Sequence, residues 1–147
     1  MTDTGQVADK SGSHRVSPAA SADAGSRERL DPPAARLVSI GELTERLSAL
    51  SEWIDAANGH RNFEAIQWGR LSKIGEEFGE VIAAFIGATG QNPRKGFTHS
   101  MADVRKELLD VAVTALGAYE HLSGNEGVSI AALYAHVDRL CARAGLT

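Results

Sequence analysis

The chain has 147 residues, which is enough for one domain with a sizeable core. Its formal net charge is −4, so no basic surface indicates binding to nucleic acid. The single cysteine, Cys141, excludes an intramolecular disulfide framework and is typical of a reducing compartment. No apolar run approaches the ~20 residues of a membrane span, and the first residues lack the apolar segment of a signal peptide. We therefore expect a soluble, cytoplasmic protein that binds neither nucleic acid nor membranes.

The first part of the chain, residues 1–36, predicts a disordered N-terminal tail. It is rich in Ser, Ala, Gly and Asp, and the first aromatic residue of the chain is Trp53. Such a composition cannot bury enough apolar surface to offset the entropy lost on ordering. Pro32 and Pro33 mark its end, so we expect the folded domain to span residues 37–147.

Capping residues and helical periodicity predict two helices in the first half of this domain. The first helix begins near Ser39, where Glu42 three residues later gives the capping-box pattern, and it stops at Asn58. The second helix has Asn62 as its N-cap and runs to about Ala88.

Two further helices follow a loop with several helix breakers. Ser100 and Asp103 form a second capping-box pattern, which predicts a helix over 101–122. The last helix begins near Ser129, and Cys141 adjoins its apolar face as a small buried hydrophobe; this face carries Ile130, Leu133, Val137 and Leu140. Strand-like alternation is absent, so we expect an all-α fold, a bundle of four helices.

Carboxylates gather on the two central helices. Residues three apart on a helix share a face, so Glu77 lies beside Glu80, and Glu107 lies beside Asp110. Glu76 lies on the flank of the same patch. A loop of about a dozen residues makes the two helices antiparallel, which brings both pairs to one site. Oxygen ligands without a partner His or Cys suit Mg²⁺ or Mn²⁺.

The surroundings of these carboxylates favour a metal site over a solvated acidic face. Between Glu107 and Tyr119 the only charges are Glu107 and Asp110, and a helix that is apolar on nearly all sides is a buried one. The second helix carries an apolar stripe of Ile74, Phe78, Val81, Ile82 and Phe85. Buried carboxylates are rare unless they are paired or bind a metal.

Three basic residues are candidates for binding phosphate. Arg94 and Lys95 lie in the loop between the central helices, where they either hold the charges of a polyphosphate or are solvated loop residues. Lys73 lies one turn before Glu77, from which it either reaches phosphate or pairs with Glu76 or Glu77.

The motif EExxE over 76–80, followed by ExxD over 107–110, resembles the signature of the MazG-like, all-α nucleoside triphosphate pyrophosphohydrolases. The segments GEEFGEVIAAFIG, NPRKG and KELLDVAVTAL are similar to its bacterial branch, and the resemblance covers roughly residues 39–140. It implies hydrolysis between the α- and β-phosphates of a nucleoside triphosphate, which gives the monophosphate and pyrophosphate, and it implies a homodimer or homotetramer. The Mg²⁺ ligands that it implies are Glu77, Glu80, Glu107 and Asp110.

The resemblance also implies catalytic roles for two glutamates. Glu76 assists, either by holding the metal ligands in place or by orienting the attacking water. A nearby carboxylate accepts the proton of that water, and the spacing leaves open which glutamate is this base. The catalytic candidates are Glu76 and Glu77. For the base of the nucleotide, Trp68 is the candidate contact, together with Trp53 and Phe63, although aromatic residues at helical spacing are also typical of a core.

Two other interpretations compete with this enzyme. A di-iron carboxylate bundle requires Glu-x-x-His, whereas the third positions after Glu77 and Glu107 are Glu80 and Asp110. A non-catalytic helical module that binds a nucleotide or a protein would keep the fold and show no turnover.

Overall fold

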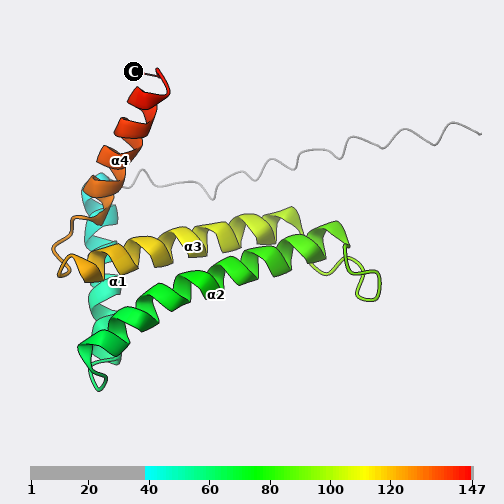
Figure 1. Cartoon of the computed structure of the whole chain (residues 1–147), viewed down its shortest axis with the longest axis horizontal. Helices are drawn as coiled ribbons and strands as arrows, with labels where there is room; N and C mark the ends of the chain where they lie inside the picture. Colours follow the sequence, from blue (N-terminus) through cyan, green and yellow to red (C-terminus); the bar gives the residue numbers. More distant parts are fainter. Residues whose placement is uncertain (1–38, 147) are drawn as a thin grey trace, which may run out of the picture. The chain divides into compact units, whose positions relative to one another are not determined.

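The computed structural model describes residues 39–146, and all of the regular structure in this range is helical. The four helices are α1 (Ile40–Ala57), α2 (Phe63–Thr89), α3 (Met101–Leu122) and α4 (Ser129–Arg143) (Figure 1). The described residues contain no strand, so the predicted all-α fold of four helices is confirmed. The predicted disordered tail, residues 1–36, lies outside the described range.

Side-chain caps fix the starts of the first three helices where the sequence predicts them. The Ser39 hydroxyl accepts a hydrogen bond from the Glu42 backbone N–H at 3.0 Å. The Asn62 side-chain oxygen caps α2 in the same way, because it accepts a hydrogen bond from the Ala65 backbone N–H at 2.8 Å. In α3 the capping box is complete, because Ser100 accepts from the Asp103 N–H while the Asp103 carboxylate accepts from the Ser100 N–H at 2.7 Å. These bonds satisfy backbone donors that a helix start leaves unpaired.

Two glycines shape the connection from α2 to α3. Gly90 ends α2 with φ of 64°, a left-handed conformation that glycine adopts without steric cost. Gly87 is buried, and a side chain there would collide with Thr98 and His99. The Thr98 N–H donates to the Gly87 carbonyl at 3.1 Å, so the loop folds back onto the last turns of α2.

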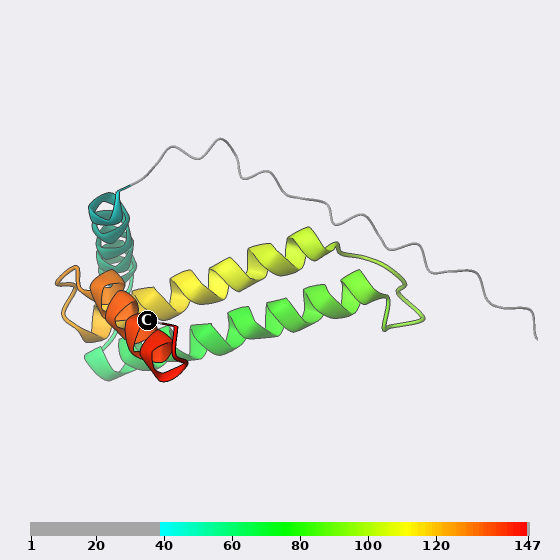
Figure 2. The ribbon, with the colours of Figure 1, turned by 90° about the horizontal axis from the view of Figure 1, so that it is seen from above.

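The helices α2 and α3 form an antiparallel hairpin, as expected, and lie side by side in two perpendicular views (Figures 1 and 2). Val81, Ala84 and Val104 form the buried core between them. α1 packs across the end of the hairpin where α2 begins and α3 ends, and it contacts α3. α4 contacts the ends of α3 and α1.

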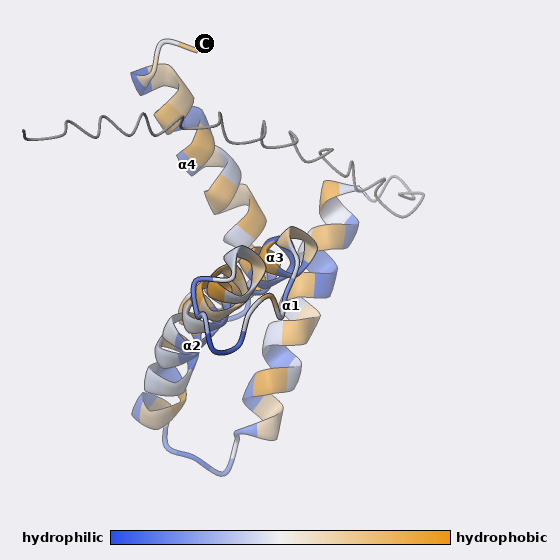
Figure 3. Cartoon of the chain, turned by 90° about the vertical axis from the view of Figure 1, so that its right-hand side faces the viewer, coloured by the Kyte–Doolittle hydropathy of each residue, from blue (hydrophilic) through white to orange (hydrophobic). Residues whose placement is uncertain are grey.

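The expectation that α3 is a buried helix is wrong for the single chain. Leu108 and Leu109 are 50% and 67% exposed, and Phe78 on the predicted stripe of α2 is 57% exposed. α1 crosses the hairpin at one end, so most of the hairpin's length has no third helix over it (Figures 1 and 2). Apolar residues recur along α4 in the view coloured by hydropathy (Figure 3). The apolar face of α4 is also largely exposed, at Leu133, Val137 and Leu140. Cys141 beside this face is half-buried. None of the helices within 39–146 has the length and hydropathy to cross a membrane.

Candidate metal centre

Three carboxylates from two helices converge in the middle of the hairpin. One oxygen each of Glu77 on α2 and of Glu107 and Asp110 on α3 lie within 4.8 Å of one another. Glu77 is buried, and the other two are half-buried. The helical period puts Glu107 and Asp110 on one face, and the antiparallel packing brings Glu77 opposite them. We call these three residues the acid cluster.

Two of the predicted site residues lie at the edge of this cluster. Glu80 is exposed, and its carboxylate is not part of the group within 4.8 Å. Glu76 is also exposed and pairs with Lys73. The structure therefore brings together three of the four predicted metal ligands, and Glu80 stays a predicted ligand at the solvent side.

Lys73 pairs with carboxylates in the structure, which is one of the two roles predicted for it. Its Nζ lies 2.9 Å from Glu76 Oε1 and 3.0 Å from Glu77 Oε1. These hydrogen bonds, first to Glu76 and then to Glu77, raise the pKa of Lys73 above its usual range. The side chain is 46% exposed, so it is free to move when a ligand arrives.

Lys106 covers the α3 side of the cluster, and sequence reasoning missed it. Its Nζ lies 2.8 Å from Asp110 Oδ2 and 3.1 Å from Glu107 Oε1. Hydrogen bonds to Asp110 and then to Glu107 raise its pKa above the usual range. The spacing of four residues between Lys106 and Asp110 was the available signal, because such pairs face each other on a helix.

One oxygen of the cluster has no partner. Glu107 Oε2 is buried and accepts no hydrogen bond within the described part of the chain. A buried carboxylate oxygen without a partner destabilises the fold, and a cation beside it removes that penalty. Oxygens on opposite sides of a Mg²⁺ ion lie about 4.2 Å apart, so small side-chain rotations bring the three carboxylates to one ion. The residues therefore fit a divalent metal with hard oxygen ligands.

The loop cations lie at the end of the hairpin away from α1. Arg94 and Lys95 are exposed, and their side chains form no hydrogen bond or ion pair within residues 39–146. Glu77 precedes Thr89, the last residue of α2, by twelve positions, which is about 18 Å of helix. The role of Arg94 and Lys95 in binding phosphate stays a prediction.

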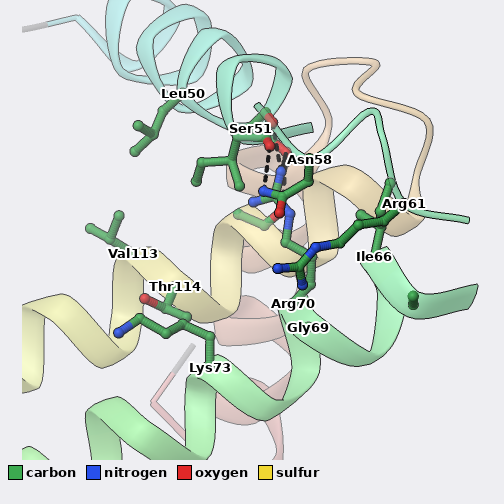
Figure 4. Close-up of a pocket in the computed structure, with 13 residues that line it drawn as sticks. Leu50, Ser51, Asn58, Arg61, Ile66, Gly69, Arg70, Lys73, Val113 and Thr114 are labelled. Atoms are coloured by element: carbon green, nitrogen blue, oxygen red, sulfur yellow. Dashed lines mark hydrogen bonds between the residues drawn. The ribbon is translucent and has the colours of Figure 1, made fainter. Parts of the chain in front are cut away.

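A cavity of about 380 Å³ lies between α1, α2 and α3, on the side of the acid cluster that faces away from the loop with Arg94 and Lys95 (Figure 4). It is lined by residues of all three helices, and Lys73 connects it to the cluster. None of the aromatic candidates for contact with the base lines this cavity. Trp53, Phe63 and Trp68 are instead each about two-thirds exposed. Contact of the base with Trp68 stays a prediction.

A second polar cluster ties α1, α2 and α3 together behind this cavity. Asp55 Oδ1 accepts from Arg70 Nη2 at 2.7 Å. Asp55 Oδ2 lies 2.7 Å from His121 Nδ1 and accepts from Asn125 Nδ2 at 2.9 Å. Arg70 Nη2 also donates to the Ser51 carbonyl at 2.6 Å. We call this group the Asp55 network.

The electrostatics of the Asp55 network show that its charges are matched. Burial pushes the pKa of Asp55 upward, but hydrogen bonds from Asn125, Arg70 and His121 outweigh it and hold the pKa below the usual range. The sequence gives no local signal for this network, because Arg70 lies 15 positions from Asp55 and His121 lies 66 positions from it. His121 therefore has a structural partner on another helix.

Models of protein families, curated proteins and solved structures all give no match to this chain. The resemblance to the MazG-like pyrophosphohydrolases therefore rests on the residues of the two acidic motifs and the segments around them.

Proposed function

We propose that this protein is a metal-dependent nucleoside triphosphate pyrophosphohydrolase, which converts a (deoxy)nucleoside triphosphate and water to the monophosphate and pyrophosphate. Two observations carry the proposal: carboxylate oxygens of three acids on two helices converge, and one Glu107 oxygen is buried without a partner among residues 39–146. Such a group repels itself unless cations lie among its members. The resemblance of the two acidic motifs supplies the reaction.

The acid cluster would hold Mg²⁺ or Mn²⁺, with Glu80 as a fourth ligand from the exposed side. When bound, the ion supplies positive charge for the phosphate oxygens of the substrate. Glu77 and Glu76 are adjacent on α2, one buried and one exposed. Either is placed to orient the attacking water and to accept its proton.

The two lysines would change partners when substrate binds. Lys73 and Lys106 are about half and two-thirds exposed, so both ammonium groups can leave the carboxylates without crossing packed side chains. Once released, they can pair with phosphate oxygens, as Lys does in many phosphate sites. Arg94 and Lys95 would add charge at the loop end.

Assembly into a homodimer or homotetramer is part of the proposal. The apolar residues on α3 and α4 that the single chain leaves exposed support it, because monomeric proteins rarely expose contiguous apolar patches of large area. A measurement of molar mass in solution by sedimentation equilibrium tests this part separately.

One observation favours a second candidate, the non-catalytic helical module. Each of the three carboxylates already forms an ion pair with Lys73 or Lys106, so two ammonium charges offset part of the negative charge of the cluster without a metal. A protein of this kind would bind a nucleotide or a protein partner and would show no turnover.

Product analysis distinguishes the two candidates. We expect nucleoside triphosphates with Mg²⁺ to give monophosphate and pyrophosphate in equal amounts on anion-exchange chromatography, and EDTA to stop the reaction. Glu77→Gln and Asp110→Asn should lower turnover by about a hundredfold or more, and the exposed α4 variant Asp138→Asn should not. Diphosphate and orthophosphate as products would reject the mechanism. Absence of turnover with every triphosphate would favour the non-catalytic module.

A further inference from the structure

The cavity between α1, α2 and α3 adjoins the acid cluster through Lys73. Lys73 lines the cavity and at the same time lies 3.0 Å from a carboxylate oxygen of Glu77. Thr114 also lines it, one helical turn after Asp110. One turn is about 6 Å of helix, so a ligand in the cavity has one end beside the carboxylates. The cavity and the acid cluster are therefore placed to hold two parts of one molecule.

The walls of the cavity suit a planar ring. Leu50 and Ile54 from α1, Ile66 from α2 and Val113 from α3 supply apolar side chains on several sides. Gly69 lines it without a side chain, and a Cβ atom added there would meet no other atom within 4 Å. A volume of about 380 Å³ lies within the usual range for small-ligand pockets.

A basic side chain stands at the end of the cavity opposite Lys73. Arg61 lies in the connection between α1 and α2, and its side chain extends toward the cavity (Figure 4). Its guanidinium forms no hydrogen bond or ion pair with any described residue. By contrast, Arg70 beside it is held by Asp55 and Ser51. The Arg61 donors are thus available to a ligand.

We propose, on the basis of the function proposed above, that this cavity holds the base and sugar of a guanine nucleotide and that Arg61 is the specificity-determining residue. A guanidinium presents two parallel N–H donors, which match the adjacent O6 and N7 acceptors of guanine. Adenine presents an N6–H₂ donor in place of O6, so the same arginine disfavours it.

This placement also fixes the direction of the substrate. With the base in the cavity, the sugar lies near Lys73 and Thr114, and the α-phosphate is the first phosphate to reach Glu77 and Asp110. The outer phosphates then extend along the hairpin toward its loop, residues 90–100. Attack at the phosphate nearest the carboxylates makes pyrophosphate the leaving group.

The first test compares kcat/KM for GTP, ITP, ATP, CTP, UTP and 7-deaza-GTP, using the full chain with Mg²⁺. We expect GTP and ITP to exceed ATP by about tenfold, and 7-deaza-GTP, which lacks the N7 acceptor, to fall by a similar factor. Arg61→Met should reduce the preference for GTP over ATP to about twofold or less. The matched variant Arg143→Met, an exposed arginine in the last turn of α4, should keep the wild-type preference.

The second test needs no turnover. Equilibrium dialysis with guanosine and adenosine in EDTA should give tighter binding of guanosine by about tenfold, and Arg61→Met should remove the difference. Equal binding of the two nucleosides, or a preference unchanged in Arg61→Met, would overturn the base assignment even if every triphosphate were hydrolysed. A guanosine preference that depends on Arg61, in a protein without turnover, would support the cavity assignment and reject the enzyme.

Discussion

Two clusters of charged side chains lie between the helices, and they differ in how their carboxylates are satisfied. In the Asp55 network, both oxygens of Asp55 face polar partners from α2, from α3 and from the segment after α3, and the Arg70 side chain is 9% exposed. In the acid cluster, the partners are the ammonium groups of two exposed lysines, and Glu107 Oε2 has no partner in the part of the chain that the structure describes.

The difference separates a structural group from one that is open to a ligand. Donors that are buried and held by several bonds cannot leave without unfolding the segment that carries them, so the Asp55 network has no room for exchange. Exposed lysines exchange their carboxylate for water or phosphate at little cost. The two groups therefore differ in the exposure of the cations that pair with their carboxylates.

The largest expected effect is on stability, and it falls on the Asp55 network. Asp55→Ala leaves the Arg70 guanidinium buried without its carboxylate, which should lower the free energy of unfolding by about 3 kcal/mol. Asp110→Ala breaks only an ion pair with a lysine that is 67% exposed, so it should cost about 1 kcal/mol or less. Urea denaturation of both variants measures the difference. Equal losses would show that the two clusters are structurally alike.

A second prediction concerns the stability of the fold in acid. The folded pKa values of Asp55 and Glu120 lie below their usual values of 3.8 and 4.5. For Glu120, burial raises the pKa, and hydrogen bonds from Ser129 and the Gly127 backbone outweigh this effect. Both groups therefore stabilise the fold above the unfolded pKa values, and this contribution disappears as the pH falls through the folded ones.

Denaturation curves between pH 5 and about pH 2 check this prediction. The free energy of unfolding should decrease as the pH falls below about 4.5, with a smaller decrease in Asp55→Asn. An identical pH dependence in the wild type and in Asp55→Asn would contradict the role given to Asp55.

The smallest effect concerns Lys106, which a metal must displace. Lys106→Met removes this competitor, so the affinity for Mg²⁺ should rise by about fivefold, the equivalent of one surface ion pair. Isothermal titration calorimetry measures the change, and Lys95→Met in the loop is the matched control with no expected effect. Weaker Mg²⁺ binding in Lys106→Met would mean that the lysine supports the metal ligands instead of competing with the metal.

Local chemistry explains which parts of the fold the sequence predicts well. Helix starts at Ser39, Asn62 and Ser100 follow from side chains that cap backbone N–H groups within three residues. The approach of Glu77 to Asp110 follows from the helical period and one short loop.

Features that depend on distant partners were not predictable in this way. Asp55 gains its partners from α2, from the last turn of α3 and from the segment after α3, and no spacing in the sequence relates them. Helical periodicity also shows which apolar residues share a face without showing what covers that face. For this reason Leu109 and Phe78 were expected in a core and are exposed in the single chain.

The central claim is that the acid cluster binds a divalent metal, and the thermal stability of the wild type and Glu107→Ala with and without Mg²⁺ tests it most directly. At a Mg²⁺ concentration a hundredfold above its Kd, binding of Mg²⁺ to the folded state should stabilise the wild type by about 2.7 kcal/mol and raise its Tm. Glu107→Ala should show no such rise, and without metal it should be at least as stable as the wild type, because it loses a buried oxygen without a partner. An equal rise in Tm in both proteins would contradict the account.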